Sequence, residues 1–327
     1  MEVAYYNLAG GINQALTKTE LGLDTKRIYW ADAENVEILQ NRGIVKQKGN
    51  SLFLDIGEEV TGLFEMSAYD TSKLVITTVS GKIYIYDELH LKKILVNKTL
   101  SGVKPIFLNF LNGILIMTES DGLFYLKNNS TYDVVDCELK TLAGEILTSG
   151  VMAVYKGRVW VAKDATIYYS ALGTYNDFTA QGDAGYINEF HTDTGAITAL
   201  KPYKDYLAVY KKDSVYLLTG SSSDDFAINL FANKGAVGAN SILNVDNKQY
   251  FLSNGIFALE QVGELNQIQL GSEISQKIKD EFSRFEKLEN SIALHYEAKN
   301  QIWYFFPYVS DKFFHTIWIN DYENKAW

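Results

Sequence analysis

Cysteine and proline are scarce in this sequence, which has one Cys and three Pro among 327 residues. The single cysteine, Cys137, excludes an intramolecular disulfide and gives no sign of an oxidising compartment. No apolar run approaches the ~20 residues of a membrane-spanning helix. Residues 1–6 lack the basic start and apolar core of a signal peptide. We therefore expect a soluble protein that is made in the cytosol and has no membrane partner.

Positive charge is also in deficit, since 30 Lys and Arg stand against 40 Asp and Glu. The formal net charge of −10 argues against a surface that holds the backbone of DNA or RNA. It suits a protein past which nucleic acid moves without sticking. Hydrophobic residues, at 47%, are abundant, as are Tyr (22) and Phe (17). This composition supports a substantial core and favours strands over helices.

Short alternating apolar segments recur along the chain and are typical of antiparallel strands. The clearest example is 195–220, where two strands flank the polar turn Lys211-Lys212-Asp213 and a further strand leads in. Equivalent first strands begin roughly 45 residues apart, near Gly62, Gly102, Gly150, Gly195, Asn240 and Asn290. A period of this length is typical of β-propellers. We therefore predict an all-β fold, a β-propeller with six blades; five or seven blades are the alternatives.

Each repeat is expected to contain at least three strands joined by short turns. The second strands are predicted at 74–78, 114–118, 159–162, 207–210, 250–252 and 302–306. The third strands are predicted at 83–86, 123–126, 167–170, 215–219, 256–259 and 317–320.

The chain divides into an N-terminal arm, 1–34, and a single propeller domain, 35–327. Residues 35–49 read as a β-hairpin, because a turn with Asn and Gly joins two alternating segments. The last repeat stops at Trp327 before a fourth strand is completed, so its open edge needs a cover. Our hypothesis is that the 35–49 hairpin pairs with this last blade and closes the ring.

Deletion of residues 1–50 tests this hypothesis. We expect the melting temperature to fall sharply, because the shortened chain would leave the last blade with an unpaired edge. Thermal unfolding of the full and shortened chains measures the difference, and equal melting temperatures would contradict the hypothesis.

One segment, 272–285, departs from the strand pattern and reads as a short inserted helix. Its N-cap is predicted at Ser272. The apolar side chains follow the spacing of an amphipathic helix, at Ile274, Ile278, Phe282 and Phe285. We expect this helix to pack on the rim between two blades; docking of a partner protein is the alternative.

The sequence offers no catalytic or metal-binding motif. Its histidines are far apart and lack metal-ligand spacing: His90, His191, His295 and His315. A propeller glycosidase needs two carboxylates held across a pocket. The turn Ser120-Asp121-Gly122 is similar to the aspartate boxes of sialidases but does not recur, and arginine is sparse. We therefore predict no enzymatic activity and no cofactor or metal; a glycoside hydrolase is an alternative.

Aromatic side chains form either a sugar-binding platform or the filling between blades. Alternation in Tyr168-Tyr169 and 303–306 favours the second interpretation. Phe313 and Phe314 are different, because they fall in the long loop 307–315 of the last repeat. An exposed apolar pair in a loop indicates a contact with another protein.

Several stretches share a further pattern. The N-terminal part has a small-Gly-Gly segment, an acidic Asn-Val strand and a Gly turn that ends in Gly, at 7–13, 32–38 and 43–49. The middle part has a strand, a Ser and an Asn/Asp-Phe loop, at 167–173 and 176–178. Further matches are 214–220, 235–242 and 251–256. Together these stretches resemble the tail-hub or head-closure (stabilisation) proteins of short-tailed bacteriophages.

The resemblance implies a structural virion protein. Such proteins form a propeller-based ring, usually of six copies, that docks below the portal and adaptor proteins. The ring closes the head and lines the DNA exit channel, through which DNA passes without sequence-specific binding. Tail fibre or needle proteins are further expected partners, and the expected location is the virion. A carbohydrate- or receptor-binding propeller is the alternative function.

The expected contacts with other copies and partners lie in the N-terminal arm and in the loops 221–225 and 307–315. The candidate interface residues are Tyr5, Tyr6, Gly10, Gly11, Asn13, Phe313, Phe314, Asp224 and Asp225.

Overall fold

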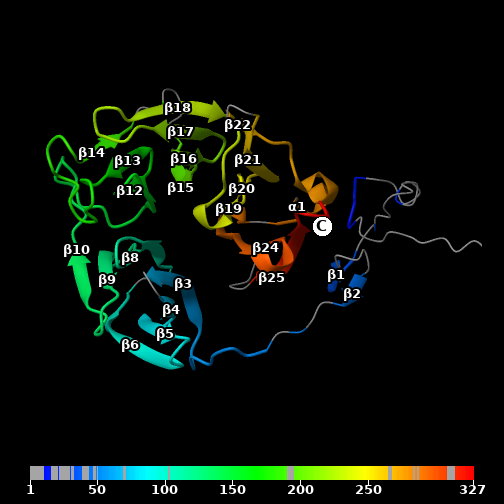
Figure 1. The fold of residues 1–327 in the computed structure, drawn as a ribbon, viewed down its shortest axis with the longest axis horizontal. Helices are drawn as coiled ribbons and strands as arrows, with labels where there is room; N and C mark the ends of the chain where they lie inside the picture. The colour runs from blue at the N-terminus through cyan, green and yellow to red at the C-terminus, as the bar shows by residue number, and fades with distance from the viewer. Residues whose placement is uncertain are drawn as a thin grey trace, which may run out of the picture. The chain divides into compact units, whose positions relative to one another are not determined.

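The computed structural model describes residues 11–15, 21, 30, 33–38, 44–46, 49, 51–68, 71–101, 104–188, 190, 195–263, 267–282, 284–285, 287–307 and 314–327. The regular structure of these residues is almost entirely antiparallel β-sheet (Figure 1). No described helix is long and apolar enough to span a membrane.

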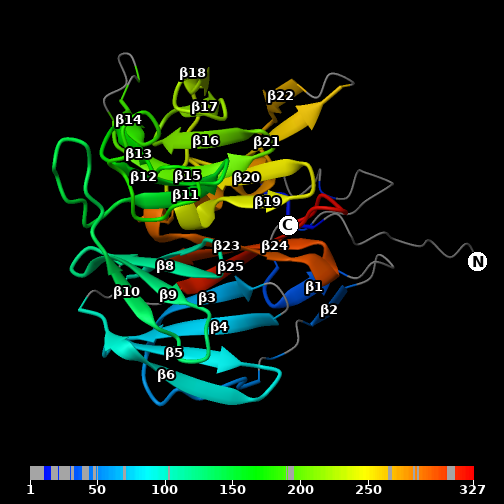
Figure 2. The same ribbon diagram turned by 60° about the vertical axis from the view of Figure 1, so that its left-hand side comes forward.

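Six sheets follow one another along the chain, and in each of them consecutive strands are neighbours. Figure 2 shows this order in the first sheet, where β3 to β6 lie side by side. Because six consecutive meanders are the blades of a six-bladed β-propeller, the predicted fold class and blade number are confirmed.

The bounds of the strands are as follows. The first blade has β3 (Val60–Ala68), β4 (Thr71–Thr78), β5 (Lys82–Asp87) and β6 (Lys92–Thr99). The second has β7 (Ile106–Asn109), β8 (Gly113–Thr118), β9 (Gly122–Lys127) and β10 (Val134–Cys137). The third has β11 (Val151–Tyr155), β12 (Arg158–Lys163), β13 (Thr166–Tyr169) and β14 (Gly185–Ile187). The fourth has β15 (Ile197–Tyr203), β16 (Tyr206–Lys211), β17 (Val215–Thr219) and β18 (Ala227–Ala232).

The last two blades complete the series. The fifth has β19 (Leu243–Val245), β20 (Lys248–Leu252), β21 (Ile256–Val262) and β22 (Gln267–Leu270). The sixth has β23 (Ile292–Tyr296), β24 (Gln301–Pro307) and β25 (Phe314–Asp321). All of the predicted second and third strands coincide with strands of these blades. The fourth strands, β6, β10, β14, β18 and β22, were not located from the sequence.

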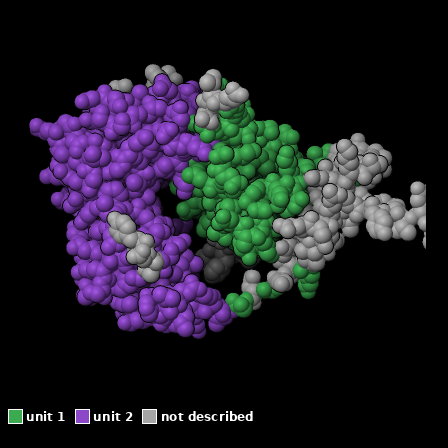
Figure 3. Space-filling view, viewed as in Figure 1, with its two compact units in different colours: residues 1–51, 234–327 green, residues 52–233 purple. Residues whose placement is uncertain are grey.

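The chain forms two compact units, residues 1–51 with 234–327 and residues 52–233 (Figure 3). In residues 52–233, the first four blades share three apolar cores, each made by side chains of consecutive blades. Tyr169 is one of the buried residues of these cores. The other unit has a core between the fifth and sixth blades, which contains Tyr304 and Phe306. These aromatic side chains therefore fill the space between blades, as the sequence indicates.

The predicted helix 272–285 is shorter than expected. A 3-10 turn, Ser275–Ile278, leads into one α-helical turn, α1 (Lys279–Phe282). The N-cap is Ile274, so the prediction of Ser272 was wrong. The helical segment begins later than predicted because the residues before it are bonded to β21. The Ile274 N–H donates to the Ile256 carbonyl, and the Ile256 N–H donates to Ser275 Oγ. The apolar face was predicted correctly, since its four side chains pack into the core between the fifth and sixth blades.

The predicted hairpin is present as β1 (Val36–Ile38) and β2 (Ile44–Lys46), which form a two-stranded sheet of their own. Among the described residues β1 and β2 pair with no strand of the sixth blade, so the expected pairing with that blade is not formed there. A different N-terminal segment lies against the end of the chain. The N–H of Ile12 donates to the carbonyl of Trp327 at 2.9 Å.

Candidate interaction surface

The long connection between β13 and β14, residues 170–184, stands out among the turns of the blades. A connection of this length without regular structure is uncommon inside a compact domain, and one class of such loops is functional. It contains Ser170 and residues 176–178, which belong to the stretches that carry the resemblance. We call it the bridging loop, because its side chains and backbone reach the blades on both sides of the third blade.

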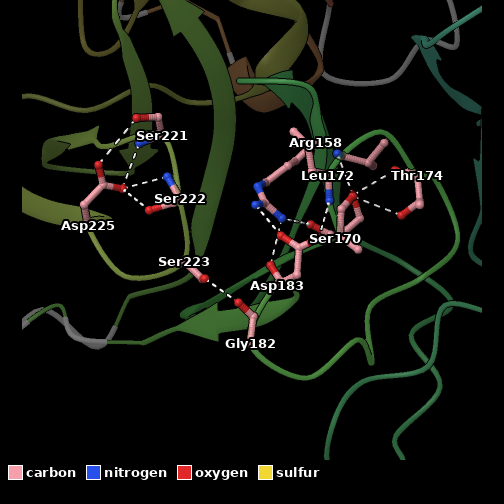
Figure 4. Close-up of polar contacts among 12 residues, drawn as sticks. Arg158, Ser170, Leu172, Thr174, Gly182, Asp183, Ser221, Ser222, Ser223 and Asp225 are labelled. Atoms are coloured by element: carbon pink, nitrogen blue, oxygen red, sulfur yellow. Dashed lines mark hydrogen bonds and ion pairs between the residues drawn. The ribbon is translucent and has the colours of Figure 1, made fainter.

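A buried arginine holds the two ends of the bridging loop together (Figure 4). Arg158, the first residue of β12, is only 3% exposed. Its Nη1 donates to the carbonyls of Ser170 at 2.8 Å and Asp183 at 2.7 Å. Its Nη2 forms an ion pair with Asp183 Oδ1 at 2.5 Å. One charged group therefore bonds to both the first residues and the last residues of the loop.

The second oxygen of Asp183 is also used. Oδ2 accepts a hydrogen bond from the Leu172 N–H at 2.9 Å. This backbone bond, together with the bond from Arg158, holds the pKa of the Asp183 carboxyl below its usual value. The guanidinium carbon of Arg158 also lies 5.9 Å from the ring centre of Tyr169 and 5.8 Å from that of Phe226. The loop is thus fixed by the ion pair between Arg158 and Asp183, and the rings of Tyr169 and Phe226 lie beside the guanidinium of this pair.

Ser170 is a structural residue. Its side chain is fully buried, and its Oγ accepts a hydrogen bond from the Val159 N–H at 3.0 Å. The same hydroxyl lies within donor distance of the carbonyls of Thr174 at 2.8 Å and Ala171 at 3.0 Å. A hydroxyl used in this way closes a tight turn of the backbone. Its bonds to carbonyls and its burial do not suit a nucleophile, which needs a neighbouring base and access to substrate.

The bridging loop contacts the second and fourth blades. Tyr175 stacks on Tyr125 of β9, with ring centres 4.3 Å apart. Phe178 is buried in the core between the second and third blades. On the other side, Ser223 Oγ donates to the Gly182 carbonyl at 2.6 Å (Figure 4). These contacts tie three blades of residues 52–233 together at one place.

Asp224 and Asp225, two candidate interface residues, occupy the neighbouring turn between β17 and β18. Asp225 Oδ1 accepts hydrogen bonds from the N–H groups of Ser222 at 2.6 Å and Ser221 at 2.9 Å. These bonds, that of Ser222 first, lower the pKa of Asp225. Both aspartates are exposed, and Asp225 stabilises its own turn. The structure brings this turn next to the bridging loop, which the sequence did not indicate.

Three of the other candidate interface residues, Gly11, Asn13 and Phe314, belong to the unit of residues 1–51 and 234–327. Gly11 and Asn13 are buried in the unit that contains the C-terminal residues, and Asn13 Oδ1 accepts a hydrogen bond from the Ala15 N–H. Phe314 is the first residue of β25 and lies opposite Pro307 in the ladder. Tyr5, Tyr6, Gly10 and Phe313 lie outside the described residues.

The turn that is similar to an aspartate box lines a cavity of about 300 Å³, which Cys137 and Glu138 also line. Asp121 is engaged in its own turn, because its carboxylate accepts hydrogen bonds from Thr118 Oγ1 at 2.6 Å and the Ser101 N–H at 2.9 Å. Burial raises the pKa of the Cys137 thiol to about 11. Among the described residues, no group of three or more His, Cys, Asp or Glu is placed to hold a metal ion.

No family model and no curated protein matches the chain. Similar solved structures include the computationally designed Ika8 protein, with 15% identity over 80% of this chain and 70% of that chain, at a TM-score of 0.45. Hsv2 of Kluyveromyces lactis has 12% identity over 78% of this chain and 83% of its own, at 0.43. BamB of Moraxella catarrhalis has 12% identity over 77% and 82%, also at 0.43. Identities and scores this low carry no argument about function.

Proposed function

We propose that this chain is a structural protein of a bacteriophage particle, a tail hub that docks below the portal–adaptor complex. In this role it closes the head and lines the channel through which DNA leaves. The observation that supports the proposal is that several residues of the stretches resembling tail-hub proteins lie in the bridging loop. Ser170, Asp177 and Phe178 all make contacts that hold the bridging loop in place. The residues that carry this part of the resemblance therefore belong to one loop.

Each of these three residues has a physical role in the loop. The hydroxyl of Ser170 bonds to the backbone at the start of the loop. Asp177 Oδ1 accepts hydrogen bonds from the N–H groups of Thr179 and Ala180, both at 3.0 Å. Phe178 anchors the loop in the core. A loop held in this way loses little conformational entropy when a partner binds, which suits a permanent contact in an assembly.

The charge of the chain agrees with a channel protein. A net charge of −10 disfavours binding of the DNA backbone and permits the duplex to slide. Identical subunits that surround such a channel make heterologous contacts, which close into a ring when the rotation between neighbours is a fraction of a full turn. We propose six copies, together with contacts to the portal, the adaptor and the tail fibre or needle proteins.

Quantitative mass spectrometry of purified particles tests this function. The particles come from the phage or prophage that encodes the chain, and the portal protein is the internal standard. We expect this chain at roughly half the copy number of the portal, because a sixfold ring would sit below a twelvefold one. Absence of the chain from particles that contain the portal and package DNA would refute the proposal.

A further inference from the structure

The sixth blade ends in an unpaired edge. Within the described part of the chain each of the first five blades has a fourth strand, whereas the sixth blade stops at β25. On the side of β25 away from β24, the Asp321 N–H donates to the Ala326 carbonyl at 2.9 Å, and the Ala326 N–H donates back at 3.1 Å. Because backbone groups alternate along a strand, the N–H and C=O of Ile317 and Ile319 point to this same outer side. No hydrogen bond of the described residues uses these groups.

The outer strands of the other five blades differ in how well they are protected against pairing with another chain. Exposed edge strands are usually protected by lysine or other charges, by proline, or by short length. β6 contains three lysines, β10 contains Asp136, β14 has three residues and β22 has four. β18 has six residues, AINLFA, with no charge, proline or glycine. Its one bulge lies near its end and leaves residues 227–230 in regular register with β17. β18 is therefore the least protected of these outer strands.

Two residues of β18 direct their backbone groups away from β17. Ser214 accepts a hydrogen bond at 2.9 Å from the N–H of the last residue of β16, so its backbone groups face β16. By alternation, those of Tyr216 and Leu218 also face β16. Their partners in β18 are Leu230 and Ile228, whose N–H and C=O therefore point outward. None of the hydrogen bonds between described residues uses these outward groups.

We propose that β18 of one copy of this chain pairs with β25 of a second copy. Each edge offers two free N–H and two free C=O groups at residues two positions apart, and residues 316–320 carry no charge, like β18. The antiparallel arrangement used within the blades places Leu230 opposite Ile317 and Ile228 opposite Ile319. Apolar side chains directly opposite each other stabilise such a ladder. The pairing supplies the sixth blade of one copy with a fourth strand from the other.

This contact is head-to-tail, because it joins different edges of the two copies. Contacts of this kind repeat from copy to copy and produce either a closed ring or a filament. The inference deepens the proposed function, since it supplies a contact between the copies of the ring. It rests on that function only for the number of copies and for their place in a particle.

The variants Leu230→Lys and Ile317→Lys test the two edges, because a lysine on an edge strand opposes pairing. The two side chains are 51% and 45% exposed. Leu95→Lys is the control for the first, since Leu95 is 57% exposed on the outer strand β6. Leu294→Lys is the control for the second, since Leu294 is 50% exposed on β23, away from the edge of the same blade. All four variants change the net charge equally, and thermal unfolding shows which of them are folded.

Sedimentation velocity over a range of protein concentrations measures the self-association of each folded variant. We expect the dissociation constant to rise at least about tenfold in both edge variants, the loss of a typical interface anchor. The control variants should associate like the wild type. A wild type that stays monomeric at the highest concentration reached, or edge variants that associate as tightly as their controls, would overturn the proposal.

Cysteine cross-linking tests the pairing even where a lysine variant does not fold. Leu230→Cys and Ile317→Cys are made as separate proteins on a Cys137→Ala background, so that each has one cysteine. Residues directly opposite in an antiparallel ladder are close enough for a disulfide. Oxidation of an equimolar mixture should link the two different proteins, whereas each protein alone should remain mostly unlinked. Efficient linking of Leu230→Cys to itself would instead show a symmetric contact between two β18 strands and overturn the proposal.

The results separate this inference from the proposed function. If the mixed cross-link forms but the chain is absent from particles, the tail-hub function fails and the strand pairing stands. If the chain occurs in particles at half the copy number of the portal but the mixed cross-link does not form, the strand pairing fails and the tail-hub function stands.

Discussion

Replacement of Asp183 by Asn is expected to destabilise the protein by about 3 kcal/mol, the lower end of the range for breaking a buried ion pair. The substitution leaves the guanidinium of Arg158 buried, with only carbonyl groups as partners. The expected loss is at the lower end because the side chain of Asp183 is itself 41% exposed. Urea unfolding followed by tryptophan fluorescence measures it, since the buried Trp160 packs against Tyr169 beside this ion pair.

A matched control separates this effect from a general loss of negative charge. Asp205 pairs with Lys156 at 3.8 Å, and its side chain is 94% exposed. Exposed pairs contribute about 1 kcal/mol or less, so Asp205→Asn should change the free energy of unfolding little. Similar losses in the two variants would show that the burial of Arg158 has no special importance.

The double variant Arg158→Met with Asp183→Asn gives a further check. Removal of both charges eliminates the unpaired guanidinium, and an apolar side chain can still pack against Tyr169 and Phe226. We expect the double variant to be more stable than Asp183→Asn alone. If the losses of the single variants simply add, the energetic coupling between Arg158 and Asp183 is absent.

Much of the propeller could be predicted from the sequence, because its second and third strands are buried and strongly patterned. The prediction of 215–219 coincides with β17, and that of 159–162 lies within β12. The fourth strands gave a weaker signal. In β6 most side chains are exposed or half-buried, and β14 has only three residues. Apolar periodicity is weak where a strand covers the outside of a sheet.

The centre of the candidate surface could not be predicted from residue type alone. Arg158 stands in the sequence next to the turn residue Gly157 and looks like an ordinary surface residue. Its role depends on Asp183, which is far along the chain and reaches it only because the bridging loop returns to β12. One available signal was that Arg158 directly precedes the apolar segment 159–162. A charged residue next to a buried segment is expected to have a partner, because charged residues are rarely buried unpaired.

The contacts of the N-terminal residues were not foreseen from the sequence. The sequence assigned Gly11 and Asn13 to an interface with other proteins, and the structure places both inside the unit that contains Trp327. Glycine carries no side-chain signal of the surface that it approaches. The close contact of Gly11 becomes apparent only from the position of Trp327, at the other end of the sequence.

Replacement of Gly11 by Ala is the second change with a large expected effect. Gly11 has a φ of +72°, and a Cβ at this position would lie 2.7 Å from the Trp327 carbonyl oxygen and 2.8 Å from its nitrogen. The left-handed conformation contributes about 1 kcal/mol, and the overlap with backbone atoms about 2 kcal/mol more. We therefore expect a loss of about 3 kcal/mol in the free energy of unfolding, measured in urea.

Gly263 offers a close control, because its φ is +70° and a Cβ there would have no atom within 4 Å. Gly263→Ala should show only the conformational cost, about 1 kcal/mol, and the difference between the two variants isolates the contact with Trp327. Removal of Trp327 should itself destabilise the chain, because Ile12 and Ile274 lose hydrogen bonds to it. In that shortened chain Gly11→Ala should cost much less than in the full chain. Unchanged stability of Gly11→Ala, combined with weaker assembly into particles, would instead return Gly11 to the interface role assigned from the sequence.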